Sequence, residues 1–113
     1  MHEIWLSKQI LQLITKTAKD RKLKKVNKVI IEIGQLVAVD KLSLTFGFDL
    51  VAKGTIAENA LLEIKDTFAE AFCEKCTKKV SIMNYGDNCS ICNGYSLKII
   101  KGDEFKVLSM EAE

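Results

Sequence analysis

Proline is absent from this chain of 113 residues, and histidine occurs once, at position 2. Without proline, no proline-rich linker separates two domains. One histidine beside the N-terminus argues against enzymes that need a histidine base inside a pocket. The length itself predicts one domain, or one domain with a small appendage.

Long apolar runs and a leader are also missing. No run approaches the roughly 20 apolar residues of a membrane span, and the N-terminus has no basic segment followed by an apolar one, as a secretory signal would. Hydrophobic residues make up 48% and charged residues 28%, which is typical of a folded soluble protein. We therefore expect a cytoplasmic protein without a membrane partner, in which thiols stay reduced.

The formal net charge is only +2, which does not by itself imply a nucleic-acid partner. The charge is uneven, however, because a basic cluster is opposed only by Asp20; it comprises Lys16, Lys19, Arg21, Lys22, Lys24, Lys25 and Lys28. Cations favour the C-terminal end of a helix dipole. The cluster is either the solvated end of a helix with the loop after it or a patch that binds anions.

Hydrophobic periodicity predicts the first elements. A helix of about 15 residues is expected to begin near Trp5 to Ser7, because apolar or small residues recur at spacings of three and four at Leu6, Ile10, Leu13, Ile14 and Thr17. Val29, Ile31 and Ile33 then alternate with polar residues, Ile30 excepted, and predict a strand that Gly34 closes.

The segment from Asp40 to Lys53 is ambiguous. Apolar residues alternate as in a strand at Leu42, Leu44, Phe46, Phe48 and Leu50, whereas Asp40 is a good helix cap and Gly54 a good helix stop. A helix here would be apolar on two sides and therefore largely buried. Trp5, Phe46 and Phe48 are all expected to belong to the core.

Later strands are expected at Leu62 and Ile64, from Tyr95 to Ile99, and from Phe105 to Val107, with a turn at residues 101–103. Strands from both halves of the chain with helices between them predict an α+β fold that carries a cysteine-bearing excursion.

All four cysteines lie in two pairs, Cys73-x-x-Cys76 and Cys89-x-x-Cys92, with twelve residues between the pairs. Such spacing lets each pair form one tight knuckle, and two knuckles complete a tetrahedron of thiolates that suits Zn²⁺. A redox dithiol, an iron centre and disulfides are the alternatives. Four cysteines close the coordination sphere, so we expect this zinc to be structural, holding together residues too few for a core of their own.

The N-terminus is a second candidate metal site. The amine of Met1, the backbone nitrogen of His2 and the His2 imidazole can close adjacent chelate rings around one ion. An amine with a pKa near 8 and an imidazole with a pKa near 6.5 are available close to neutral pH, and a planar set of nitrogens is what Ni(II) or Cu(II) prefers. Glu3 could supply a carboxylate or orient the imidazole. A frayed terminus without a function is the alternative.

Several motifs together resemble the HypA/HybF family. They are Met1-His2-Glu3, the segments 31–36 (IEIGQL) and 54–60 (GTIAENA) with Leu62 and Ile64, the paired cysteines, and Gly102-Asp103-Glu104-Phe105. Paired cysteines alone occur in many zinc ribbons, whereas their combination with Met-His-Glu at residue 1 is much more specific. The resemblance covers essentially the whole chain.

The resemblance implies a nickel metallochaperone of [NiFe]-hydrogenase maturation and no enzyme. It implies nickel as cargo on His2, the terminal amine and amides, and zinc on Cys73, Cys76, Cys89 and Cys92. It implies an α/β nickel-binding domain, a small mixed sheet with two helices, at residues 1–69 and 100–113, an inserted zinc ribbon at residues 70–99, and a helix from Asp40 to Lys53. The implied partners are the GTPase HypB and the hydrogenase large subunit, and some members also serve urease maturation.

Two features depart from the family pattern: proline is missing, and Asn93 precedes Gly94 after the last cysteine, which could alter the turn of the second knuckle.

The rival function is a zinc-ribbon adaptor that binds nucleic acid or protein through the basic cluster, with binding that weakens in salt. No aromatic residue interleaves with those lysines as a stacking platform would require, which disfavours nucleic acid.

Overall fold

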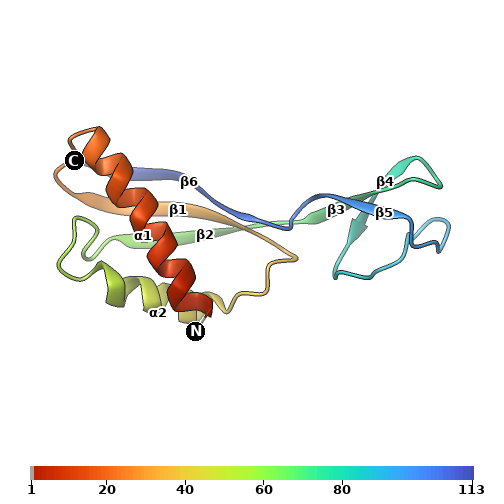
Figure 1. Ribbon diagram of the computed structural model, residues 1–113, viewed down its shortest axis with the longest axis horizontal. Helices are drawn as coiled ribbons and strands as arrows, with labels where there is room; N and C mark the ends of the chain where they lie inside the picture. The colour runs from red at the N-terminus through yellow and green to blue at the C-terminus, as the bar shows by residue number, and fades with distance from the viewer. Residues whose placement is uncertain (1) are drawn as a thin grey trace. The chain divides into compact units, whose positions relative to one another are not determined.

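The computed structural model describes residues 2–113, and of His2 only the backbone. It contains the helices α1 (His2–Asp20) and α2 (Lys41–Ala52). The strands are β1 (Val26–Gly34), β2 (Leu61–Thr67), β3 (Ala69–Cys73), β4 (Lys78–Ile82), β5 (Leu97–Lys101) and β6 (Phe105–Ala112). Two helices with two small sheets confirm the predicted α+β class (Figure 1). No helix among the described residues combines the length and the apolar character needed to cross a membrane.

The chain divides into two compact units. The first consists of the N-terminal segment through Ile31, Val39–Ile64 and Val107–Glu113, and the second of Glu32–Ala38 and Lys65–Lys106. Strands are ordered β2-β1-β6 in one sheet and β4-β3-β5 in the other. In the second sheet both neighbours run antiparallel to β3, so that Cys73 pairs with Lys78 on one side and with Leu97 on the other.

The helix α1 begins three to five residues earlier than the apolar stripe predicted, at His2. Its buried face repeats every four residues at Leu6, Ile10, Ile14 and Ala18, and it packs against α2. Leu13, placed in the apolar stripe by the sequence, is half exposed. Trp5 was expected in the core but is 56% exposed, because it lies on the side of α1 away from that buried face.

The segment after Asp40 is a helix, as the resemblance implied, and its alternating pattern is misleading. Asp40 is the N-cap, and its carboxylate accepts a hydrogen bond from the N–H of Ser43 at 3.2 Å. The capping bond satisfies one of the first N–H groups of the helix, which have no partner inside it. The chain leaves the helix through Lys53 and then Gly54, whose φ of 76° is readily adopted by glycine.

The prediction that α2 is buried on both apolar sides is wrong. Leu44 and Phe48 are completely buried, whereas Leu42 is 84% and Phe46 67% exposed. A helix with one neighbouring layer can cover only one of its two stripes. Phe48 is therefore the core aromatic residue that the sequence indicated, and Phe46 is not.

Most strand predictions were correct in position and short in extent, but the strand expected from Tyr95 to Ile99 lies two residues later, at Leu97–Lys101. The first strand begins at Val26 instead of Val29, and its inward residues Val29, Ile31 and Ile33 are buried as expected. The last strand continues to Ala112. Strands β3 and β4, which flank the first cysteine pair, were not predicted.

Candidate metal centre

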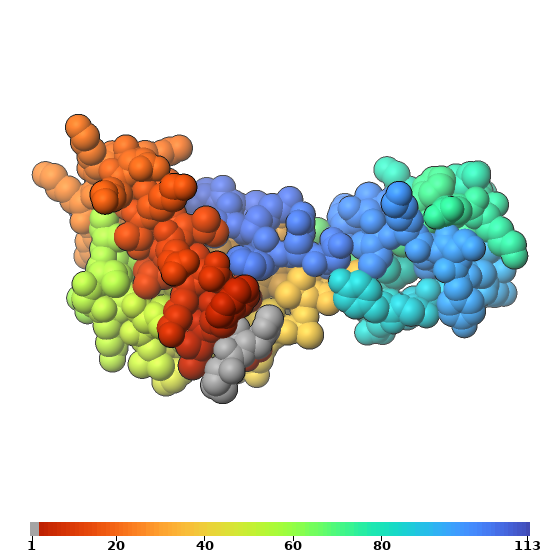
Figure 2. Space-filling view, in the orientation of Figure 1, coloured from red at the N-terminus to blue at the C-terminus, as the bar shows by residue number. Residues whose placement is uncertain are grey.

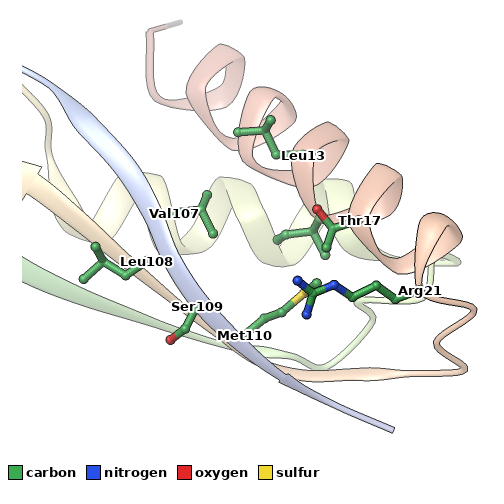
Figure 3. A pocket seen from close by; sticks show the side chains of 8 residues that line it. Leu13, Thr17, Arg21, Val107, Leu108, Ser109 and Met110 are labelled. Carbon is green, nitrogen blue, oxygen red and sulfur yellow. The ribbon is translucent and has the colours of Figure 1, made fainter.

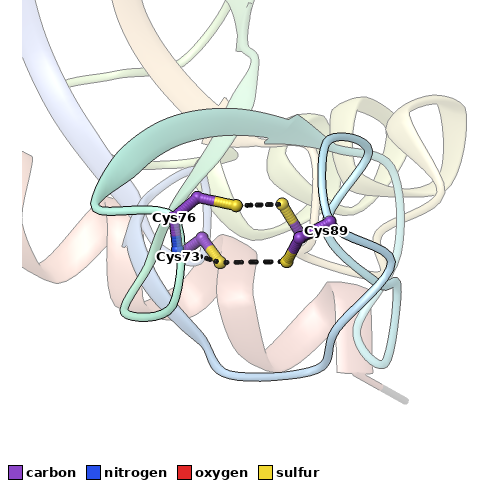
Figure 4. Close-up of side chains that lie close together, drawn as sticks. Cys73, Cys76 and Cys89 are labelled. Carbon is purple, nitrogen blue, oxygen red and sulfur yellow. Dashed lines mark hydrogen bonds between the residues drawn. The ribbon is translucent and has the colours of Figure 1, made fainter.

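The four cysteines meet at one point at the end of the β4-β3-β5 sheet. Cys73 closes β3, Cys76 follows in the turn to β4, and Cys89 and Cys92 lie in the loop before β5. Their sulfur atoms all lie within 4.8 Å of one another, and Figure 4 shows the side chains of Cys73 and Cys76 facing that of Cys89.

The separations fit a tetrathiolate metal site. The Sγ atoms of Cys73 and Cys92 are 3.7 Å apart, and those of Cys76 and Cys89 are 3.9 Å apart. Four sulfurs bound at about 2.3 Å to one ion at the centre of a regular tetrahedron lie about 3.8 Å from each other. The cluster can therefore accept an ion such as Zn²⁺ with little movement of the thiols.

Backbone N–H groups support the sulfurs. The N–H of Cys76 donates to Cys73 Sγ and the N–H of Ile91 to Cys89 Sγ, each at 3.4 Å. Such donors stabilise a thiolate more than a thiol. Backbone hydrogen bonds, chiefly that of Cys92 and then that of Ile91, lower the pKa of Cys89 from 9.0 to about 7.

The pKa of the Cys76 thiol shifts in the opposite direction. A hydrogen bond with the Cys92 side chain, followed by partial removal from water, raises the pKa of Cys76 to about 12. Four neighbouring thiols cannot all ionise unless a cation balances them, and a bound metal ion deprotonates its thiols outright. The chemistry of these four donors thus matches a metal site.

Each knuckle ends in a residue with left-handed backbone. Thr77 has φ 56° and donates its N–H to the carbonyl of Cys73 at 2.7 Å, while Asn93 has φ 62° and donates to the carbonyl of Cys89 at 2.9 Å. Asparagine adopts this conformation more readily than most side chains. Asn93 therefore makes the turn that the second knuckle requires, and Gly94 then accepts the N–H of Cys89 at 2.7 Å.

The predicted nickel ligands are only partly visible. Met1 and the side chain of His2 lie outside the described residues, while the backbone of His2 begins α1. Glu3 is half-buried, and its carboxylate accepts the N–H of Asp40 at 3.4 Å.

Ser7 is a supporting residue that the sequence analysis missed. It is fully buried, and its hydroxyl lies 2.9 Å from the carbonyl oxygen of Glu3 and 3.0 Å from that of Leu44 in α2. The hydroxyl thus links the first turn of α1 to α2. A serine on the buried face of an amphipathic helix was the available signal, because a buried hydroxyl needs a partner.

Comparison with known proteins identifies the family. A family model described as "Hydrogenase/urease nickel incorporation, metallochaperone, hypA" matches residues 1–112. The hydrogenase maturation factor HypA of Legionella pneumophila (strain Lens) is 47% identical over 113 residues, and that of Acidithiobacillus ferrooxidans (strain ATCC 53993) is 38% identical, with complete coverage of both chains in each case.

Solved structures agree in fold. A solution structure of HypA protein superposes with a TM-score of 0.75 at 27% identity, over 100% of this chain and 97% of the other. The solution structure of the Ni metallochaperone HypA from Helicobacter pylori gives 0.72 at 24% identity, over 97% and 96% of the two chains. This chain therefore belongs to the HypA family of metallochaperones for nickel incorporation into hydrogenase and urease.

Proposed function

We propose that the chain binds Ni(II) as its cargo through the amine of Met1, backbone nitrogens, and the imidazole of His2. The single observation that carries this proposal is the family match, which includes Met1-His2-Glu3 and describes nickel incorporation. A planar set of nitrogen donors favours Ni(II) over Zn²⁺. Ligands on a terminal segment can also be exchanged one at a time without unfolding the domain.

The start of α1 at His2 is compatible with coordination by backbone nitrogens. The first four N–H groups of an α-helix have no partner within the helix, so nitrogens at positions 2 and 3 can release their protons to solvent and bind an ion without breaking a helical hydrogen bond. The positive end of the helix dipole disfavours a cation there. Glu3, which is acidic and lies in the first turn, offsets that field.

Delivery of the ion is the remainder of the proposal. The chain passes nickel to the [NiFe]-hydrogenase large subunit in the cytoplasm, in concert with the GTPase HypB, and has no catalytic activity of its own. A chain with one histidine and a closed set of four cysteines offers no pairing of nucleophile and base for catalysis. A urease maturation protein is the alternative recipient.

The second metal of the proposal is a structural zinc ion held by Cys73, Cys76, Cys89 and Cys92. The sulfur separations and the N–H donors of Cys76 and Ile91 support this ligand set. Zinc supplies no catalytic step there, because four protein ligands leave no position for water. Residues 70–99 would form the zinc ribbon, and residues 1–69 with 100–113 the nickel-binding domain.

Nickel titration by calorimetry tests the N-terminal site, using zinc-loaded protein with an unmodified N-terminus. His2→Ala and a form with two extra residues ahead of Met1 are expected to weaken binding by more than about a hundredfold, since altering even an outer partner of a ligand costs up to that much. Glu3→Gln should lose about tenfold. Zinc content and circular dichroism should stay unchanged in all three forms. Equal nickel affinity in the unmodified and His2→Ala proteins would refute the site.

Nickel affinity should also depend on pH. The amine and the imidazole, with ordinary pKa values near 8 and 6.5, must lose protons before they bind an ion. Lowering the pH protonates both ligands, so affinity is expected to fall by at least about a hundredfold between pH 7.5 and 5.5. The same titrations repeated across this range measure the effect, and a constant affinity would contradict nitrogen coordination at the N-terminus.

A further inference from the structure

A groove lies between α1 and β6 in the first unit, and its lining includes neither a cysteine nor a residue of the first turn of α1. Its volume is about 460 Å³. The lining consists of Leu13, Ile14, Thr17 and Arg21 from α1 and Val107, Leu108, Ser109 and Met110 from β6. Figure 3 shows Val107 and Thr17 pointing into the space between helix and strand, with Arg21 extended across one end beside Met110.

The strand that forms one wall is an edge strand. Among the strands that the structure describes, the order β2-β1-β6 gives β6 a neighbour on one side only. The outer side of an edge strand presents a row of N–H and C=O groups that can pair with another extended chain. A groove between an edge strand and a helix is the setting in which peptides bind by adding a strand, with pockets for alternate side chains.

The charge around the groove is mainly positive, although Asp20 ends α1 and Glu113 pairs with Lys25 through the backbone. Arg21 lies at its end, and the exposed residues Lys16, Lys19, Lys22, Lys24 and Lys25 surround that end of α1. No ion pair occurs for these six cations within the described part of the chain, whereas Lys28 is paired with Glu63 at 3.2 Å. Figure 2 shows side chains of this stretch, in orange, projecting from the surface.

We propose that this groove is a docking site for an extended acidic segment of a partner protein, which adds as a strand beside β6. Apolar side chains of the segment occupy the space between Leu13 and Val107, and its carboxylates meet Arg21 and the neighbouring lysines. Arginine binds a carboxylate through two parallel hydrogen bonds, which fixes the segment's register. The lysines raise the rate of encounter with an acidic partner.

Other occupants fit less well. A second copy of the chain would offer its own β6, but that strand carries one lysine and one glutamate and brings no excess of negative charge. A nucleic acid would satisfy the cations, yet the groove contains no aromatic residue on which bases could stack. A nucleic acid also lacks the peptide groups that pair with a strand edge.

The test uses peptides of about six residues, the usual length of a strand, with blocked ends. The probe alternates valine with glutamate, a second peptide alternates valine with lysine, and a third repeats the probe with N-methylated valines. Binding to the zinc-loaded chain is followed by amide shifts in NMR spectra. Shifts are expected for residues 13–21 and 107–110 with the glutamate probe only.

Two variants with matched controls test the apolar lining of the groove and the positive charge at its end. Arg21→Glu should weaken binding of the glutamate probe about tenfold. Lys22→Glu makes the same charge change outside the groove lining and should weaken binding less than about threefold. Leu13→Asp, at a half-exposed position, should abolish binding, and Leu42→Asp, at an exposed leucine on α2, should not. All four variants should keep the circular dichroism of the parent chain.

Several results would overturn the proposal. Absence of probe binding, or shifts confined to other residues, removes the site. If the lysine peptide binds as tightly as the glutamate probe, the charge argument is wrong. If the N-methylated peptide binds as tightly as the glutamate probe, the segment does not add as a strand. Shifts of the 107–110 amides that depend on protein concentration alone would assign the groove to a second copy. Displacement of the probe by a short oligonucleotide, with the same amides shifted, would assign it to nucleic acid.

Discussion

Two glycines fix how closely backbones approach in the second unit. A Cβ built on Gly34 would lie 2.3 Å from the carbonyl carbon and oxygen of Gly102, and a Cβ on Gly102 would lie 2.5 Å from Cα of Ala69. The obstacles are backbone atoms, which cannot rotate away. Both glycines belong to the motifs on which the family resemblance rested, and close packing explains why no larger residue fits there.

Gly34→Ala is therefore expected to destabilise the protein by about 3 kcal/mol or more, at the upper end of the range for overpacked sites. Urea denaturation of the zinc-loaded protein measures this. Gly86→Ala is the matched control, because Gly86 has φ 87° and nothing within 4 Å of the added carbon. That variant bears only the conformational strain of an L-residue at positive φ, about 1–2 kcal/mol. Equal losses in the two variants would contradict the steric explanation.

Among the secondary elements, α2 shows what a sequence pattern can and cannot settle. Asp40 and Gly54 predicted the ends of a helix correctly, since capping is a local interaction. The period-2 alternation favoured a strand only because the helix is apolar on two sides. Which side is buried depends on α1, a contact between segments far apart in the sequence.

The two faces of α2 predict opposite results for one substitution. Phe48→Ala should cost about 3–5 kcal/mol, as expected for a buried phenylalanine. Phe46→Ala, two residues earlier on the exposed face, should cost less than about 1 kcal/mol. Thermal and urea unfolding of both variants measure the difference. A large loss for Phe46→Ala would mean that its side of α2 is covered in solution.

Strands β3 and β4 escaped prediction because their signal is weak. The buried positions of β3 are Ala69, Ala71 and Cys73, which are small and give little hydrophobic periodicity. The spacing of the cysteines, by contrast, predicted that four distant residues would meet, because metal coordination constrains spacing. The missed strands thus flank the first of the two cysteine pairs that the sequence did indicate.

Over the whole molecule, the two units differ in what stabilises them. The first has a core of large aliphatic residues and Phe48, among them Leu6, Ile10, Ile14, Ile31 and Leu44. The buried cluster of the second is small: Leu36, Ala69, Ala71, Cys73, Val80, Ile82 and Cys89. Two of these seven residues are thiols of the proposed zinc site, so we expect this cluster to depend on a bound metal.

Removal of zinc by a strong chelator should consequently unfold the second unit alone. Amide resonances of residues 69–101 are expected to collapse into the unfolded range of the NMR spectrum, because metal binding there contributes folding free energy. Resonances of α1 and α2 and the helical circular dichroism should persist, since their core contains no cysteine. Cys92→Ser, at the exposed ligand position, should weaken zinc binding and make chelation easier. If the helical circular dichroism and the amide resonances of residues 69–101 were lost together, the two units would not unfold separately. That result would mean that the metal supports a single cooperative unit.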